Sequence, residues 1–129
     1  MKSQILQTLA ALALIATSAT AQDNPMENHT ASYIAMPAAE GQSEAFAEFL
    51  AGAAPIVRDT EPGTVLWFAL QANDTLAIFD IFADEEARNA HFSGAVAAAL
   101  NQNSDTLVDG GWDEGVVANI NNSDVLSVK

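Results

Sequence analysis

Cysteine is absent from this sequence, and positive charge is scarce. Only four lysines and arginines oppose seventeen aspartates and glutamates, for a net charge of −13. Without thiols the chain has no disulfide, no thiolate metal site and no cysteine nucleophile. Nucleic acid and anionic lipid are poor partners for so acidic a chain, because both bind basic surfaces.

A long apolar run is also missing from the N-terminal region. The apolar stretch within Leu9–Ala16 is far shorter than the roughly 20 residues that a membrane-spanning helix needs. Small residues follow at Ala19-Thr20-Ala21, and this layout is typical of a secretory signal peptide. We expect a periplasmic or secreted protein with no membrane insertion after cleavage. The expected segments are a signal peptide (1–21), a flexible leader (22–29) and one folded domain (30–129).

The first half of that domain predicts a strand, a helix and a hairpin. Thr30–Met36 is rich in apolar, aromatic and β-branched residues and stops at a proline, as an edge or terminal strand does. Apolar residues at three- and four-residue spacing predict a helix from Ser43. Two apolar runs, Thr64–Gln71 and Thr75–Phe82, flank an Asn-Asp turn and predict a β-hairpin.

The second half predicts a helix with a weak point and a closing strand. Asp84 is a good helix cap, and Glu85 and Glu86 suit the first turn. The predicted helix weakens at Ser93-Gly94, resumes through Leu100 and ends at Asn101–Asp105. One or two closing strands are expected in Gly115–Ile120 and in the final VLSVK, with a turn at residues 121–124.

This order of elements indicates an α+β fold of the ferredoxin-like βαββαβ type. Two helices cover only one face of a four-stranded sheet, yet both hairpin strands carry apolar side chains on both faces. A second copy of the sheet is the most economical cover, so we expect a homodimer whose sheets face one another. The alternative is a monomer whose closing segment folds across that face.

Two stretches, EPGTVLWFAL and AIFDIFADEEARNAHFSGAVAAAL, resemble the antibiotic-biosynthesis-monooxygenase (ABM) domain family. The similarity runs from about Ala31 to Lys129. Its most specific parts are the Pro-Gly turn into an aromatic strand, Asp80 two residues before Phe82, and the acidic helix start that leads to Ala90-His91-Phe92. Members of this family are dimeric α/β barrels and include quinol monooxygenases and haem-degrading enzymes.

The resemblance implies a secreted, cofactor-independent monooxygenase that oxidises a small quinol or phenolic aromatic with O2. Such enzymes work without metal, flavin or haem, so no cofactor is expected. The site needs an apolar cavity, a base, and donors for a developing oxygen anion. A metal site is not expected from the residues either, because one internal histidine and scattered carboxylates show no ligand spacing.

His91 and Asp80 are the candidate catalytic residues. A histidine suits proton transfer near neutral pH, and a strand carboxylate that meets it would orient the imidazole. The alternatives are structural. His91 could bind backbone at the loosened helix, and Asp80 could pair with Arg88 or with backbone.

Four aromatic residues are candidates for substrate binding, although each could equally belong to the core. Trp67 could stack on an aromatic ring, and Tyr33 could bind a ligand oxygen. Phe79 is a further candidate for the wall of the substrate cavity. Trp112 either covers that cavity as a lid or anchors its own loop. His29 has no assigned role.

Two other functions stay open. One is a non-catalytic dimer that binds a small apolar metabolite, which is favoured if His91 and Asp80 point away from the cavity. The other is haem binding or degradation. The haem-degrading branch of the family uses an asparagine on its first strand, and Tyr33–Met36 contains none.

Overall fold

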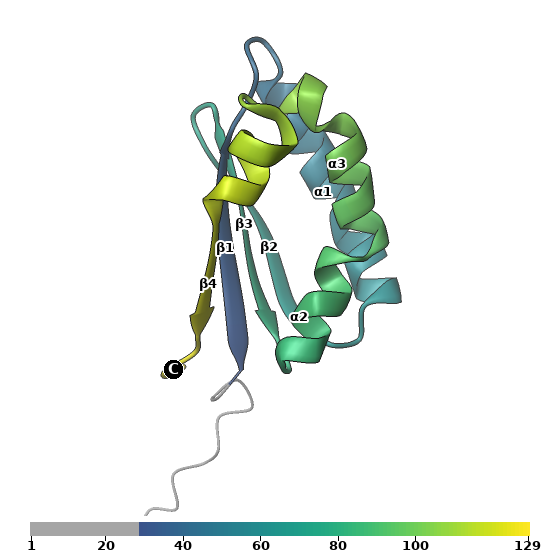
Figure 1. Cartoon of the computed structure of the whole chain (residues 1–129), viewed down its shortest axis with the longest axis vertical. Coiled ribbons are helices and arrows are strands. Elements are labelled where there is room, and N and C mark those ends of the chain that lie inside the picture. Colours follow the sequence, from purple (N-terminus) through teal and green to yellow (C-terminus); the bar gives the residue numbers. More distant parts are fainter. Residues whose placement is uncertain (1–28) are drawn as a thin grey trace, which may run out of the picture.

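A four-stranded antiparallel sheet forms one layer of the molecule, and helices cover one of its faces (Figure 1). The computed structural model describes residues 29–129, so the expected signal peptide and the leader up to residue 28 lie outside it. The strand order is β2-β3-β1-β4, which confirms the ferredoxin-like βαββαβ prediction. The strands are β1 (Thr30–Pro37), β2 (Thr64–Ala72), β3 (Thr75–Phe82) and β4 (Ile120–Asp124).

The predicted hairpin is confirmed and consists of the antiparallel strands β2 and β3. Asn73 turns it with a φ of 55°, in the left-handed region that asparagine tolerates better than most residues. A bulge follows Thr64, where the register with β3 shifts by one residue. On the other side of β3, strand β1 pairs along its whole length, with Ser32 opposite Asp80 and Tyr33 opposite Phe79.

Three helices bury their apolar stripes on one face of the sheet. The helix α1 (Ser43–Thr60) buries Phe46, Leu50, Ala53 and Val57, which recur at the spacing of a helix face. The helix α2 (Glu85–Phe92) begins as expected at Asp84, whose carboxylate accepts a 2.8 Å hydrogen bond from the Ala87 backbone N–H. The helix α3 (Ala95–Leu107) continues after a short break. No helix among residues 29–129 is long and apolar enough to cross a membrane.

The predicted end of the second helix at Asn101–Asp105 is wrong, because α3 continues to Leu107. The polar residues there have weak helix propensity, but propensity is a smaller effect than burial of an apolar face. Leu100, Ser104 and Leu107 face the interior, and the intervening polar side chains are exposed.

The closing segment also differs from the prediction. Residues expected to form a strand instead form helical turns over Gly111–Val116 and Val117–Asn119, and β4 occupies the expected turn. Trp112, Val116 and Ile120 all pack against the core, so this segment is held by burial of its apolar side chains. The last five residues form no strand.

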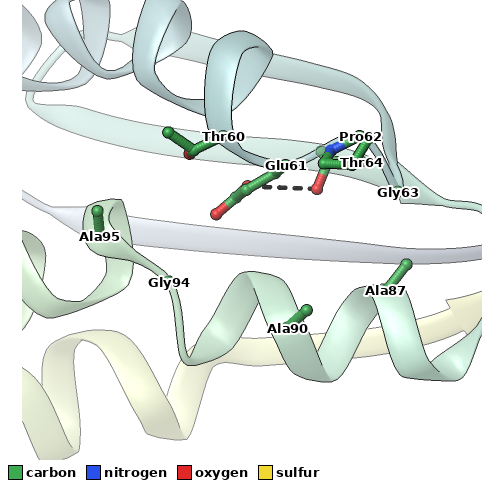
Figure 2. A pocket seen from close by; sticks show the side chains of 9 residues that line it. All are labelled: Thr60, Glu61, Pro62, Gly63, Thr64, Ala87, Ala90, Gly94 and Ala95. Atoms are coloured by element: carbon green, nitrogen blue, oxygen red, sulfur yellow. Dashed lines mark hydrogen bonds between the residues drawn. The ribbon is translucent and has the colours of Figure 1, made fainter.

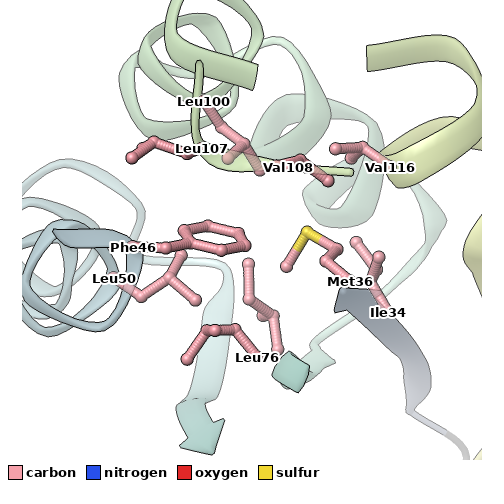
Figure 3. Close-up of a cluster of buried hydrophobic side chains, with 10 residues drawn as sticks. Ile34, Met36, Phe46, Leu50, Leu76, Leu100, Leu107, Val108 and Val116 are labelled. Carbon is pink, nitrogen blue, oxygen red and sulfur yellow. The ribbon is translucent and has the colours of Figure 1, made fainter. Parts of the chain in front are cut away.

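The main core lies between the sheet and the helices (Figure 3). The opposite face of the sheet stays open in the single chain, where Tyr33, Phe68 and Leu70 are 43, 44 and 48% exposed. Phe68 also stacks on Phe79, with ring centroids 6.2 Å apart. The expected apolar second face is therefore confirmed. The alternative cover is wrong, because the closing segment pairs at the edge of β1 and does not cross the open face.

Candidate functional site

An apolar cavity of about 230 Å³ lies between the sheet, the helices α2 and α3, and the turns that precede β4. Its walls are aliphatic and aromatic apart from one ionisable residue, His91. The volume is a little below the roughly 300 Å³ at which drug-sized ligand pockets begin. The lining residues are Ile34, Ile78, His91, Phe92, Val96, Ala97, Leu100, Trp112, Val116, Val117 and Ile120.

His91 is held between two buried carboxylates. Its Nδ1 lies 2.7 Å from Glu61 Oε2, and its Nε2 lies 3.2 Å from Asp80 Oδ2. The three side chains are 5, 9 and 0% exposed for His91, Glu61 and Asp80. His91 lies on α2 and Asp80 lies on β3. Glu61 is the residue that caps the C-terminal end of α1. Asp80 and His91, the two candidate catalytic residues, are therefore in contact.

The two contacts of the imidazole differ in quality. The Glu61 contact has the length and geometry of a hydrogen bond. The Asp80 contact is an ion-pair distance without hydrogen-bond alignment, and both Asp80 carboxylate oxygens lack a hydrogen-bond donor. Nε2 is therefore the ring nitrogen that is more easily diverted to another partner.

Burial and the two carboxylates set the protonation of this cluster. Burial alone would lower the pKa of His91, but its contacts with the Asp80 and Glu61 carboxylates together raise it above the usual value. Burial raises the pKa of Asp80, and the opposing attraction of His91 does not cancel that effect. A buried group of three ionisable side chains is expensive in folding free energy, which favours a functional reason for it.

The break between α2 and α3 makes room for the Glu61 carboxylate. A Cβ atom on Gly94 would lie 2.5 Å from Glu61 Oε1, so only glycine leaves that space open. The broken helix end is closed by backbone and by Ser93, whose hydroxyl donates to Asn89 O at 3.0 Å. The expected backbone partner for the His91 ring is therefore wrong, because its ring nitrogens contact carboxylates and not backbone.

Asp80 is not tied to Arg88, which pairs with Glu85 one turn earlier on α2. The alternative that Asp80 pairs with Arg88 is therefore wrong. Asp80 shares the helix-covered side of the sheet with Ile78 and Phe82, as strand alternation predicts. Asp80 contacts His91 but does not line the cavity.

The four aromatic candidates separate clearly. Trp112 lines the cavity and packs on the core, so it is part of the wall and also an anchor for its turn. Tyr33 and Phe79 face each other on the open side of the sheet, away from the cavity, because neighbouring strand residues alternate between faces. Trp67 lies on the helix side but packs between α1 and α3, outside the cavity wall.

Sequence reasoning missed Glu61, although a signal for it was present. Glu61 stands directly before the Pro62-Gly63 turn, within a stretch that carries the ABM resemblance. Glu61 is the C-terminal cap residue of α1 and lies in the turn that leads to β2. Its contact with a residue thirty positions later depends on how two helices pack, and no local pattern encodes that. Among residues 29–129, no group of three or more histidine and acidic side chains is arranged to hold a metal ion.

No known family model and no curated protein matches this chain. Among solved structures, the NE2512 protein of unknown function from Nitrosomonas europaea is 38% identical, with a TM-score of 0.71 over 81% of this chain and 95% of that one. A "putative antibiotic biosynthesis monooxygenase" from Bacteroides thetaiotaomicron is 15% identical, with a TM-score of 0.60 over 81% and 93% of the two chains. A protein of the same name from Chloroflexus aurantiacus is 16% identical, with a TM-score of 0.56 over 78% and 94%. The chain therefore belongs to the family of the Nitrosomonas europaea protein and has the ferredoxin-like fold of ABM-type proteins.

Proposed function

We propose that the protein is a cofactor-independent monooxygenase that oxidises a small quinol or phenolic aromatic with O2. The observation that carries the proposal is the position of His91. This residue lines an apolar cavity while two buried carboxylates contact its ring nitrogens. Ionisable groups with shifted pKa values beside a cavity are typical of catalytic sites.

The cavity suits a flat ring of limited size. Its volume of about 230 Å³ is enough for one or two fused rings, and Phe92 and Trp112 supply aromatic walls. The apolar lining excludes water, which strengthens charge interactions inside the site. A phenolic anion formed there would therefore respond strongly to the charge state of His91.

The chemistry assigned to the cluster is proton transfer. In its neutral form, His91 accepts the substrate hydroxyl proton at Nε2, and the carboxylates of Asp80 and Glu61 stabilise the resulting imidazolium. The substrate anion then passes an electron to O2. For a naphthol, one oxygen atom enters the ring to give a naphthoquinone. The other leaves as water, which takes the returned hydroxyl proton and the hydrogen displaced from the attacked ring carbon.

Oxygen uptake by the purified protein with hydroquinones, naphthols and anthrols tests this function. Turnover without added cofactor is expected, with a loss of about 100-fold in kcat for His91→Asn. His29→Asn is the matched control, because His29 lies just before β1 and outside the cavity wall. Uptake no faster than the spontaneous rate across the panel would contradict the proposal.

A non-catalytic binding protein for a small apolar metabolite is the second candidate. Two observations favour it: Asp80 does not line the cavity, and both nitrogens of His91 already contact carboxylates. Binding of naphthols measured by calorimetry, without oxygen uptake, would support this function over the first. Ala97→Trp, which fills the cavity, should abolish that binding.

We include a homodimer in the proposal, with the open faces of two sheets packed against each other. Exposed aromatic and aliphatic side chains on that face support it, since a soluble protein rarely leaves a contiguous apolar patch uncovered. Phe68→Asp is expected to give monomers in sedimentation experiments. Leu126→Asp is the control, because Leu126 is 90% exposed and lies beyond β4. A monomeric wild-type protein at micromolar concentration would contradict the dimer.

A periplasmic or secreted location is also part of the proposal. It rests on the signal-peptide pattern of residues 1–21. Mass spectrometry of the protein from the host is expected to find Gln22 at the N-terminus, in the periplasm or the medium. Intact Met1 in the cytoplasmic fraction would contradict it.

A further inference from the structure

Glu61 lines a second pocket, which opens beside the junction of α2 and α3 (Figure 2). The same side chain contacts His91. This pocket has a volume of about 350 Å³, and its walls come from the end of α1, the turn that follows, α2 and the start of α3. Glu61 lines this pocket and not the apolar cavity, whereas His91 lines the cavity and not this pocket. The contact between Glu61 and His91 therefore joins the two sides.

The two oxygens of Glu61 have different surroundings. Oε2 lies 2.7 Å from His91 Nδ1 and accepts a 3.3 Å hydrogen bond from the Thr64 hydroxyl. Oε1 is buried and has no hydrogen-bond donor among residues 29–129. The Glu61 side chain is only 9% exposed, so its carboxylate is held in place and not free to sample solvent.

Gly94 leaves the space that the Glu61 carboxylate occupies. The two helices could have formed one continuous helix, but they separate where the Glu61 carboxylate enters. Gly94 has an ordinary φ of −83°, so its lack of a side chain matters for space and not for backbone conformation. The break and the glycine together admit a carboxylate to Nδ1 of His91.

We propose that Glu61 is the positioning residue for His91, holding the proton on Nδ1 so that Nε2 is the proton acceptor. This inference rests on the proposed function, because it concerns the same base. A carboxylate on one ring nitrogen fixes the tautomer and the ring orientation, and it stabilises the imidazolium as that ion forms. The shorter and better aligned of the two contacts of His91 is the one to Glu61.

The charged groups around the imidazole are few. Glu61 faces it from the end of α1 and Asp80 faces it from β3. On α2 itself, Arg88 is paired with Glu85. Removing the charge of Glu61 therefore leaves Asp80 as the remaining carboxylate partner of His91.

Nitrogen-15 NMR of the His91 ring, followed against pH, tests the inference without requiring turnover. In the wild type we expect a neutral form protonated on Nδ1. In Glu61→Gln we expect titration at lower pH and loss of that tautomer preference. Glu48→Gln is the matched control, since Glu48 is an exposed acid on the same helix, and it should titrate like the wild type.

Gly94→Ala provides a second variant that keeps the carboxylate but moves it. The added methyl group would meet Glu61 Oε1 at 2.5 Å, so the carboxylate must move from the position in which it contacts His91. We expect the same downward shift in the His91 titration as in Glu61→Gln. This variant tests the inference even if Glu61→Gln does not fold.

Activity measurements separate this inference from the proposed function. If the enzyme turns over a naphthol, Glu61→Gln should lower kcat about 100-fold with little change in KM, because Glu61 acts through His91 and does not touch substrate. No turnover with any aromatic but a shifted titration would overturn the function and leave the positioning role supported. A titration and tautomer unchanged in both variants would overturn the positioning role, whatever the turnover.

Discussion

Raising the pH above about 6.5, the ordinary pKa of histidine, is expected to destabilise this protein through His91. Burial works to lower the pKa of His91, but Asp80 and Glu61 outweigh it, so the pKa is raised in the folded chain. Between the unfolded and folded pKa values, the folded state binds more protons than the unfolded state. The stabilisation is complete below about pH 6.5 and is lost as the pH rises through the folded value.

The size of this effect follows from one proton. A difference of one bound proton gives a slope of at most about −1.4 kcal/mol in unfolding free energy per pH unit. That is readily measured against a typical stability of about 5–15 kcal/mol. Asp80 contributes with the same sign at lower pH, because burial raises its pKa and its stabilising proton is lost as the pH rises from 3.8 through the raised value.

Urea unfolding between pH 6 and pH 9, followed by circular dichroism, measures the slope. The chain has two histidines, so a His29→Gln background leaves His91 as its only histidine. Adding Glu61→Gln should flatten the slope, because one of the two carboxylates that raise the pKa is gone. Adding Glu48→Gln should leave it unchanged.

The reasoning is refuted if stability in the His29→Gln background is constant or rises over this range. It is equally refuted if Glu61→Gln and Glu48→Gln give the same slope as their background. A constant stability would mean that the folded and unfolded chains bind the same number of protons near neutral pH, and a rising one that the folded chain binds fewer. Equal slopes would mean that Glu61 does not raise the pKa of His91.

Four other substitutions have definite expected outcomes, measured by urea unfolding or ligand binding. Gly110→Ala should destabilise the protein by about 1–2 kcal/mol, because the φ of 87° at Gly110 is unfavourable for alanine. Gly52→Ala, in open space within α1, should instead stabilise the protein by about 0.5–1 kcal/mol. Equal effects of the two substitutions would contradict this reasoning. Phe46→Ala removes a fully buried ring from the main core and should cost about 3–5 kcal/mol; a cost below 1 kcal/mol would argue against that packing. Ala97→Phe should block the apolar cavity and weaken naphthol binding at least tenfold with stability little changed, and undiminished binding would place the ligand elsewhere.

The order of strands and helices could be predicted because each element carries a local signal. The hairpin needs only two apolar runs and an Asn-Asp turn, and α1 needs only its repeating apolar stripe. The same logic failed where two patterns competed. Residues 101–105 are polar and look like a break, but Leu107 beyond them is buried and keeps the helix intact.

The candidate site was only partly predictable. Alternation along β3 placed Asp80 on the side of Ile78 and Phe82, and the helix pattern placed His91 near the loosened turn. Alternation alone could not say which side of the sheet the helices cover, so Tyr33 and Phe79 were assigned to the cavity although they lie on the open face.

The sequence by itself determined the elements, their order, the acidic and cysteine-free character of the chain, and the apolar character of both sheet faces, since these follow from composition and short-range spacing. Tertiary structure alone decided that Glu61 meets His91 through the gap at Gly94, because this contact depends on the packing of α1 against the α2–α3 junction. It also decided that Trp112 closes the cavity, because the turns before β4 fold against the core once the sheet and helices are in place. Both contacts join residues that are distant in sequence, and their free energy arises only when the whole domain is assembled.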